Sequence, residues 1–231
     1  MARFSRLTYR ATIDRMAATP KIACLPNGPY YLLNDPEPAP VPNLRRASGD
    51  ACITARGVAL CRCGGSKNKP FCDGTHSTKA FTDRKLSEDS HDQRKSYVGK
   101  RITILDNRAL CSHVGYCTDG LKAVFRQRDE PWIDPDGAAV QAIIDTIRKC
   151  PSGALSYAIG GVEAEPPKRP PMVTVTDHGP YAVTGGMELM GVKFGDGGST
   201  EHYTLCRCGA STNKPFCDGS HWDANFRDPA G

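Results

Sequence analysis

Long apolar runs and a strong excess of one charge are both missing from this sequence. No stretch approaches the roughly 18 consecutive apolar residues that a membrane-spanning helix needs, so we expect no bilayer span. The formal net charge is only +5, and lysines and arginines form no stripe interleaved with aromatic residues, which make up 7% of the chain. This composition argues against nucleic acid as a partner.

The motifs of common enzymes are also missing. The sequence has no nucleophile paired with a base, no phosphate-binding loop and no dinucleotide fingerprint. What it has in quantity is glycine and proline, 23 and 18 of 231 residues, which favours small loop-rich modules over one large core. We therefore expect a binding or carrier protein and not an enzyme.

The opening residues 1–19 carry four arginines against a single aspartate. Two interpretations are open. The segment is either a disordered leader, with the true start at Met1 or at Met16, or a transit peptide that directs the chain to an organelle matrix. The lack of an apolar segment and of a clean cleavage signal favours the leader, and with it a cytoplasmic location.

Cysteine is abundant, and its spacing is typical of metal ligands. Nine of the 11 cysteines stand in short clusters, and no signal peptide precedes them. Thiolates bound to metal in a reducing compartment therefore explain them better than disulfides do. The clearest pattern is a repeat, CRCGGSKNKPFCDGTH at 61–76 and CRCGASTNKPFCDGSH at 206–221, and a Gly-Pro-Tyr turn precedes each copy.

Within each copy the metal-binding residue types form two pairs. Cys61 and Cys63 are two apart, so in an extended segment both thiolates point to the same side. Cys72 and His76 are four apart, on one face of a helical turn for which Asp73 is a suitable N-cap. Two pairs suit two irons, and the C-x-C spacing is unusual for zinc fingers. Three cysteines and one histidine are nevertheless a normal zinc set, so counting ligands does not decide between the metals.

Both sixteen-residue stretches resemble the CDGSH iron–sulfur motif at every defining position. The resemblance implies one [2Fe–2S] cluster in each copy. It also implies that the two copies pack about a pseudo-twofold axis within one chain, which would then be a monomer. The implied ligands are Cys61, Cys63, Cys72 and His76 in the first copy, and Cys206, Cys208, Cys217 and His221 in the second.

The segment between the copies, residues 97–159, reads as a different module. KRITILD at 100–106 predicts a strand, and DPDGAAVQAIIDTIRKC predicts a helix with Asp134 as N-cap that leads into Cys150. CSHVGYC at 111–117 adds Cys111 and Cys117. These three cysteines fit a bacterial ferredoxin ligand run in which Val114 stands where the middle cysteine belongs.

Residues 97–159 also resemble the divergent mono-cluster ferredoxin-like family, a likeness carried by CSHVGYC, PWIDPDG and CPSGAL. The resemblance implies a third cluster, [4Fe–4S] or [3Fe–4S], held by Cys111, Cys117 and Cys150. The fourth ligand is open. His113 is the nearest candidate, beside water or a small molecule, although a solvent-facing or backbone-bonded loop histidine is the favoured interpretation.

Together these features predict an α+β protein, in which two small β-rich CDGSH modules flank a ferredoxin-like α+β module. The predicted parts are the leader at 1–19, the first CDGSH module at 20–83, a charged linker at 84–96, the middle module at 97–159, a Gly/Pro linker at 160–170 and the second CDGSH module at 171–231.

Three candidate clusters in one small chain predict electron transfer with a protein redox partner. Two alternatives remain: storage and transfer of clusters to an apo-acceptor protein, and a structural zinc-binding adaptor. Basic residues beside the clusters either stabilise reduced clusters and attract an acidic partner, or are ordinary solvated surface. They are Arg62, Lys67, Lys69, Arg207 and Lys214.

Overall fold

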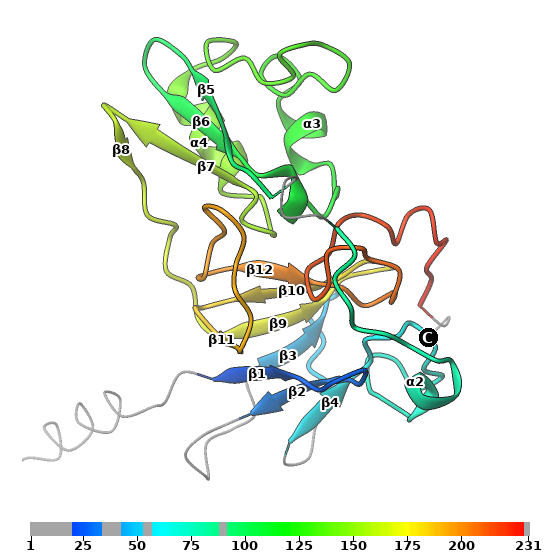
Figure 1. The fold of residues 1–231 in the computed structure, drawn as a ribbon. Coiled ribbons are helices and arrows are strands. Elements are labelled where there is room, and N and C mark those ends of the chain that lie inside the picture. Colours follow the sequence, from blue (N-terminus) through cyan, green and yellow to red (C-terminus); the bar gives the residue numbers. More distant parts are fainter. Residues whose placement is uncertain (1–19, 34–42, 53–56, 88–91, 229–231) are drawn as a thin grey trace, which may run out of the picture.

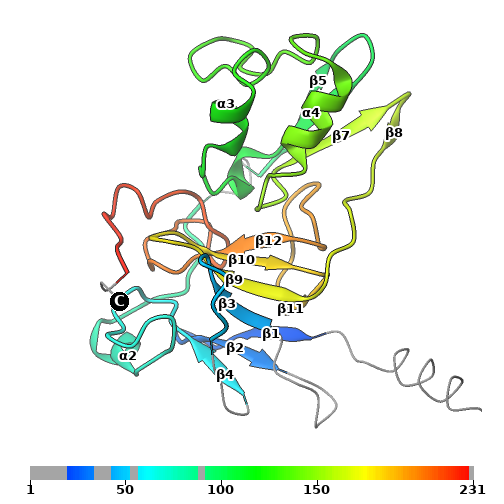
Figure 2. The same ribbon diagram turned by 180° about the vertical axis from the view of Figure 1, so that it is seen from behind.

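The computed structural model describes residues 20–33, 43–52, 57–87 and 92–228. The expectations for the leader at 1–19 and for part of the charged linker, 88–91, lie outside these residues. Within the described part, the fold is α+β as expected, with three four-stranded sheets and a few short helices (Figures 1 and 2). None of the helices in these ranges is long and apolar enough to cross a membrane.

Two of the sheets are built from the two repeated copies, and each sheet takes one strand from the other copy. The first sheet has the order β11 (Glu188–Met190), β1 (Lys21–Cys24), β2 (Tyr30–Leu33) and β4 (Val58–Leu60). The second has the order β12 (Tyr203–Leu205), β10 (Tyr181–Thr184), β9 (Met172–Val175) and β3 (Asn43–Arg46). The exchanged strands β11 and β3 run parallel to β1 and β9, whereas the other pairs are antiparallel.

The strands form because their apolar residues alternate and so line one face. In β2 the side chains of Tyr30 and Leu32 are buried, and in β10 those of Tyr181 and Val183. These faces meet in one hydrophobic core to which both copies contribute. The predicted packing of the two copies against each other is thus confirmed. The exchange of strands was not predicted, because the repeat assigns each strand to its own copy.

A reciprocal pair of tyrosines crosses the boundary between the copies. The Tyr30 hydroxyl donates to the backbone oxygens of Cys206 and Pro215, each at 2.9 Å. The Tyr181 hydroxyl donates at 2.9 Å to the matching oxygens of Cys61 and Pro70. The two rings pack edge to face with their centroids 6.0 Å apart, and both residues are fully buried.

The middle module has its own antiparallel sheet and core, and lies at one end of the paired copies (Figures 1 and 2). The helix α4 packs against β7, and α3 packs against α4. The elements are β5 (Lys95–Val98), β6 (Thr103–Asp106), the 3₁₀ helix η2 (Arg108–Leu110), α3 (Tyr116–Gly120), α4 (Val140–Ile147), β7 (Leu155–Ile159) and β8 (Val162–Glu163).

The predicted strand and helix of this module are both present, but the helix begins later than expected. The residue before α4 is Ala139, so the assignment of Asp134 as N-cap was wrong. Asp134 instead closes a turn, in which its side chain accepts from the Asp136 N–H at 3.0 Å and its carbonyl accepts from the Gly137 N–H at 3.2 Å. Ile143, Ile144 and Ile147 of α4 lie three or four residues apart and are buried, so they form the face that packs into the core of the module.

Replacing Tyr30 or Tyr181 with phenylalanine should weaken the association of the copies. Each change removes a buried hydroxyl whose single proton is shared between two backbone oxygens of the other copy, so we expect a loss of roughly 1–3 kcal/mol in the free energy of unfolding. Urea denaturation followed by fluorescence would measure it. Tyr116→Phe, at an exposed tyrosine, is the control and should change stability by less than about 0.5 kcal/mol. Equal effects for all three variants would contradict the proposed role of the reciprocal bonds.

Candidate metal centres

The first motif brings its candidate ligands together as two pairs. Cys61 and Cys63 follow β4, and their sulfurs are 4.0 Å apart. Cys72 Sγ lies 3.4 Å from Nδ1 of His76, which is part of the short helix α2 (Thr75–Thr78). The N-cap of that helix is Gly74 and not Asp73 as predicted. The Asp73 carboxylate still accepts the N–H of Thr75 at 3.0 Å, which fixes the turn.

The second motif repeats this geometry closely. The Cys206 and Cys208 sulfurs are 3.8 Å apart, and Cys217 Sγ lies 3.4 Å from Nδ1 of His221. One ion bonded tetrahedrally to two thiolates at ~2.3 Å each holds the sulfurs about 3.8 Å apart, and a thiolate with an imidazole slightly closer. The donor pairs therefore fit one ion per pair. In the described ranges, histidine, cysteine and acidic side chains form no group of three or more around a single ion.

The surroundings of most of these thiols disfavour an uncompensated thiolate. Burial raises the pKa of Cys61 and of Cys217. The hydrogen bond with Cys208, followed by burial, raises the pKa of Cys206. Buried thiolates need a compensating positive charge, which a directly bonded metal ion supplies. Backbone N–H groups provide further support, since Gly65 donates to the Cys63 sulfur at 3.4 Å.

The two motifs face each other where their backbones come closest. A Cβ on Gly64 would lie 2.2 Å from the Cys208 oxygen, and one on Gly209 would lie 2.6 Å from the Cys63 oxygen. Both glycines also have positive φ, 73° and 81°. Glycine is therefore required at both positions for conformation and for space. This approach places the two candidate centres on either side of the pseudo-twofold axis.

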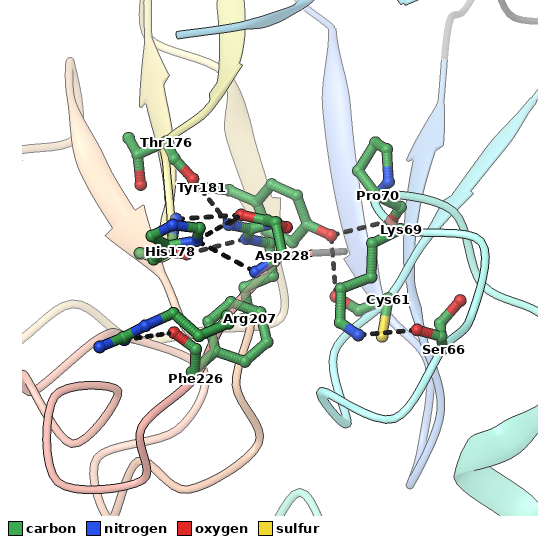
Figure 3. A network of polar contacts seen from close by, with 12 residues as sticks. Cys61, Ser66, Lys69, Pro70, Thr176, His178, Tyr181, Arg207, Phe226 and Asp228 are labelled. Carbon is green, nitrogen blue, oxygen red and sulfur yellow. Dashed lines mark hydrogen bonds and ion pairs between the residues drawn. The ribbon is translucent and has the colours of Figure 1, made fainter. Parts of the chain in front are cut away.

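The arginines beside the cysteines are buried structural groups and not solvated surface. Arg207 forms an ion pair with Asp228 and donates to the backbone oxygens of Gly179 at 2.8 Å and Thr176 at 2.6 Å (Figure 3). Arg62 is likewise buried and lies 3.4 Å from Asp83.

The sequence motifs gave no indication of a role for Asp83 and Asp228, the partners of these arginines. They occupy equivalent places in the two copies, two residues after Phe81 and Phe226. An alignment of the copies that continued beyond these phenylalanines would have revealed the matching aspartates.

Of the three lysines near the cysteines, one is ordinary solvated surface and two are positioned beside the candidate centres. Lys67 is exposed, as a solvated surface residue would be. Lys214 is buried and donates to the Ser211 oxygen at 2.5 Å. Lys69 makes the matching bond to the Ser66 oxygen at 2.7 Å, and its ammonium lies 5.7 Å from the Phe226 ring of the other copy. Lys69 and Lys214 therefore order the cysteine loops and place positive charge beside both centres.

The cysteine–histidine pairs of the two centres differ in how open they are, although Cys208 of the second set is half-buried and Cys63 of the first is buried. His221 and Cys217 are 3% and 2% exposed, whereas His76 and Cys72 are only half-buried. The sequences of the two motifs are nearly identical, so this difference arises from what covers each motif.

The three middle-module cysteines line one small cavity, although they come from separate segments. Cys111 follows η2, Cys117 lies in α3, and Cys150 comes shortly after the end of α4. Burial, followed by the charges of Cys111 and Cys150, raises the pKa of Cys117 to about 11. The guanidinium of Arg108 acts in the opposite direction on Cys111 and Cys117, and it was not foreseen from the sequence.

His113 lies in the loop between Cys111 and Cys117, and its backbone forms hydrogen bonds both within this loop and with the second CDGSH motif. Its N–H donates to the Cys111 sulfur at 3.4 Å, and its carbonyl accepts from Trp222 Nε1 at 3.2 Å. Its side chain packs close to Gly219 of the second motif. Val114 lines the cavity at the place of the missing cysteine. Trp132 packs against Phe125 in the core of the module, as expected for a packing residue.

Comparisons with known proteins agree with this division. The model of the family described as iron-binding zinc finger, CDGSH type, matches residues 27–77 and 178–222. The model of the divergent 4Fe-4S mono-cluster family matches residues 97–159. An uncharacterised protein, YjdI, of Escherichia coli strain K12 is 40% identical over 63 residues, which is 27% of this chain and 83% of YjdI. Its counterpart in strain O157:H7 gives the same values. No solved structure matches.

Replacing Asp228 with asparagine should destabilise the protein at neutral pH more than in acid. Burial alone would raise the pKa of Asp228, but hydrogen bonds and the charge of Arg207 outweigh it and lower that pKa. A lowered folded-state pKa means that the stabilisation is complete above the unfolded value of about 4 and is lost as the pH falls below it.

We expect a loss of roughly 1–3 kcal/mol for Asp228→Asn at pH 7, shrinking between about pH 5 and pH 3. Denaturation curves across that range would test this. Asp83→Asn is the matched control, with a smaller loss because its contact with Arg62 is longer. A loss for Asp228→Asn that did not change with pH would contradict the ion-pair assignment.

Proposed function

Since the chain belongs to the iron-binding CDGSH family, with a divergent 4Fe-4S mono-cluster domain between its two CDGSH regions, we propose that it is a three-cluster electron-transfer protein. The observation that carries the proposal is the repeated set of donor pairs. Thiolates 4.0 and 3.8 Å apart, and thiolate–imidazole pairs 3.4 Å apart, occur in both copies beside a third cysteine set. Clusters of this kind carry single electrons, and their potentials depend on ligand type and surroundings.

Each CDGSH region is assigned one [2Fe–2S] cluster, with one donor pair for each iron. The paired geometry supports this assignment over a single zinc, because a zinc needs its four donors around one point. The ligands assigned in the first copy are Cys61, Cys63, Cys72 and His76, and in the second Cys206, Cys208, Cys217 and His221. The neutral imidazole reduces the negative charge at each cluster, which favours a higher reduction potential than four thiolates would give.

The middle module is assigned a [4Fe–4S] or [3Fe–4S] cluster on Cys111, Cys117 and Cys150. The common cavity of the three sulfurs and the positive charge of Arg108 beside them support this assignment. Cys24 and Cys52 are assigned no ligand role, because neither belongs to a donor pair or lines the cavity of the three sulfurs.

The metal content of anaerobically purified protein tests the proposal. We expect about seven or eight irons per chain, with matching acid-labile sulfide and no stoichiometric zinc. Cys72→Ala and Cys217→Ala should each lower the iron content by about two, and Cys150→Ala by the remainder. Cys24→Ala is the matched control and should keep the full complement. Colourless protein with stoichiometric zinc would instead establish the zinc-binding adaptor.

A second function, cluster donation to an apo-acceptor protein, is favoured by the half-buried state of the first centre. Cys72 and His76 are reachable from solvent, whereas Cys217 and His221 are covered. Ligand exchange requires an incoming thiolate to reach the metal, so an open centre releases its cluster more readily.

Transfer to a plant-type apo-ferredoxin should therefore be faster from the first centre than from the second. Cys217→Ala keeps the first centre and Cys72→Ala keeps the second, which makes the two variants a matched pair. The visible absorption and circular dichroism of the acceptor would follow the transfer. Equal rates from the two variants, or transfer no faster than spontaneous decay, would reject this second function.

A further inference from the structure

The middle module contacts the second CDGSH motif at the loops that carry the candidate ligands. Trp222 Nε1 donates to the His113 oxygen at 3.2 Å, so the residue after His221 is bonded to the loop between Cys111 and Cys117. A Cβ on Gly219 would lie 2.9 Å from ring atoms of His113, which leaves no room for a side chain there. The two ligand loops are therefore packed directly against each other.

A second hydrogen bond joins the second CDGSH motif to the segment that leads into Cys111. Asn213 Nδ2 donates to the Ala109 oxygen at 2.7 Å, and the asparagine is 3% exposed. Ala109 lies in η2, two residues before Cys111. The contact thus has two hydrogen bonds and one close glycine approach, which together fix its geometry.

The first motif has no such neighbour. Gly74 occupies the position equivalent to Gly219 with nearly the same φ, 87° against 89°. A Cβ added to Gly74 would meet no described atom within 4 Å. Ser77 stands where the second copy has Trp222. Gly74 is exposed, whereas Gly219 is buried. The contact with the middle module is therefore a property of the second copy in the described part of the chain.

We propose that the middle module exchanges electrons directly with the second CDGSH centre, across the contact of His113, Gly219 and Trp222, and not directly with the first. This inference rests on the proposed function. With clusters bound at both sites, one electron would pass from the set held by Cys111, Cys117 and Cys150, which would be oxidised, to the set held by the second motif, which would be reduced, without a bond being broken. His113, Gly219 and Trp222 act as positioning residues that set the distance between the sets.

Electron paramagnetic resonance of the full chain, reduced with dithionite, tests the proximity. Two reduced clusters that lie close together broaden each other's signals. The middle-module signal should be broadened in the wild type and in Cys72→Ala, and should become narrow in Cys217→Ala. Broadening that is lost in Cys72→Ala and kept in Cys217→Ala would overturn the inference.

Flash photoreduction tests the positioning contact with variants that keep every ligand. Gly219→Ala should slow electron equilibration between the middle and second centres by roughly tenfold, because a displacement of about an ångström strongly affects a step that depends on positioning. Gly74→Ala introduces the same backbone strain in the first copy, so it is the matched control and should leave this rate within about twofold. Trp222→Phe keeps the ring, removes the hydrogen bond and should slow the step to a smaller extent.

The outcomes separate this inference from the proposed function. A wild type whose clusters reduce normally but show no broadening, or equal rates in Gly219→Ala and Gly74→Ala, would overturn the inference and leave electron transfer standing. A chain in which dithionite produces no cluster signal would overturn both.

Discussion

The hydrogen bonds from one tyrosine of each copy to the carbonyl groups of the other copy's cysteine loop are the constraint on which the structure depends. Tyr30 and Tyr181 are fully buried, and each hydroxyl lies within hydrogen-bond distance of two backbone oxygens of the other copy. Because these oxygens belong to the first cysteine and the proline of the opposite motif, neither ligand loop is held by its own copy alone. The exchanged strands β3 and β11 also join the two copies, because each completes the sheet of the other copy. The two candidate centres thus belong to one structural unit.

The middle module breaks the symmetry of that unit. Its ligand loop covers Gly219 in the second motif, while Gly74 in the first remains exposed. A covered centre lies in a region of low dielectric, where charges interact strongly and solvent has little access. An open centre can meet an external protein. Under the proposed function, two motifs with nearly the same sequence would therefore serve different tasks, one in exchange within the chain and the other in exchange with partners.

The buried basic residues show how the chain positions charge near its candidate clusters. Arg207 is neutralised by Asp228, so its role is to hold the motif against the segment that follows. Lys69 and Lys214 instead donate to backbone oxygens and lie over phenylalanine rings of the opposite copy. Within the described ranges neither lysine forms an ion pair with a carboxylate, and its positive charge would stabilise a cluster that gains an electron.

The sequence by itself determined the donor pairs, because spacings of two residues in an extended segment and four in a helical turn are local geometry. The resemblance that the repeats carry also implied the pairing of the two copies. It did not reveal the exchange of β3 and β11, the ion pair of Arg207, or the covering of the second motif. These depend on contacts between residues far apart in the chain, such as Trp222 and His113, and nothing in a local pattern specifies them. Only the tertiary structure decided which of two equal motifs is buried against the middle module and which stays open.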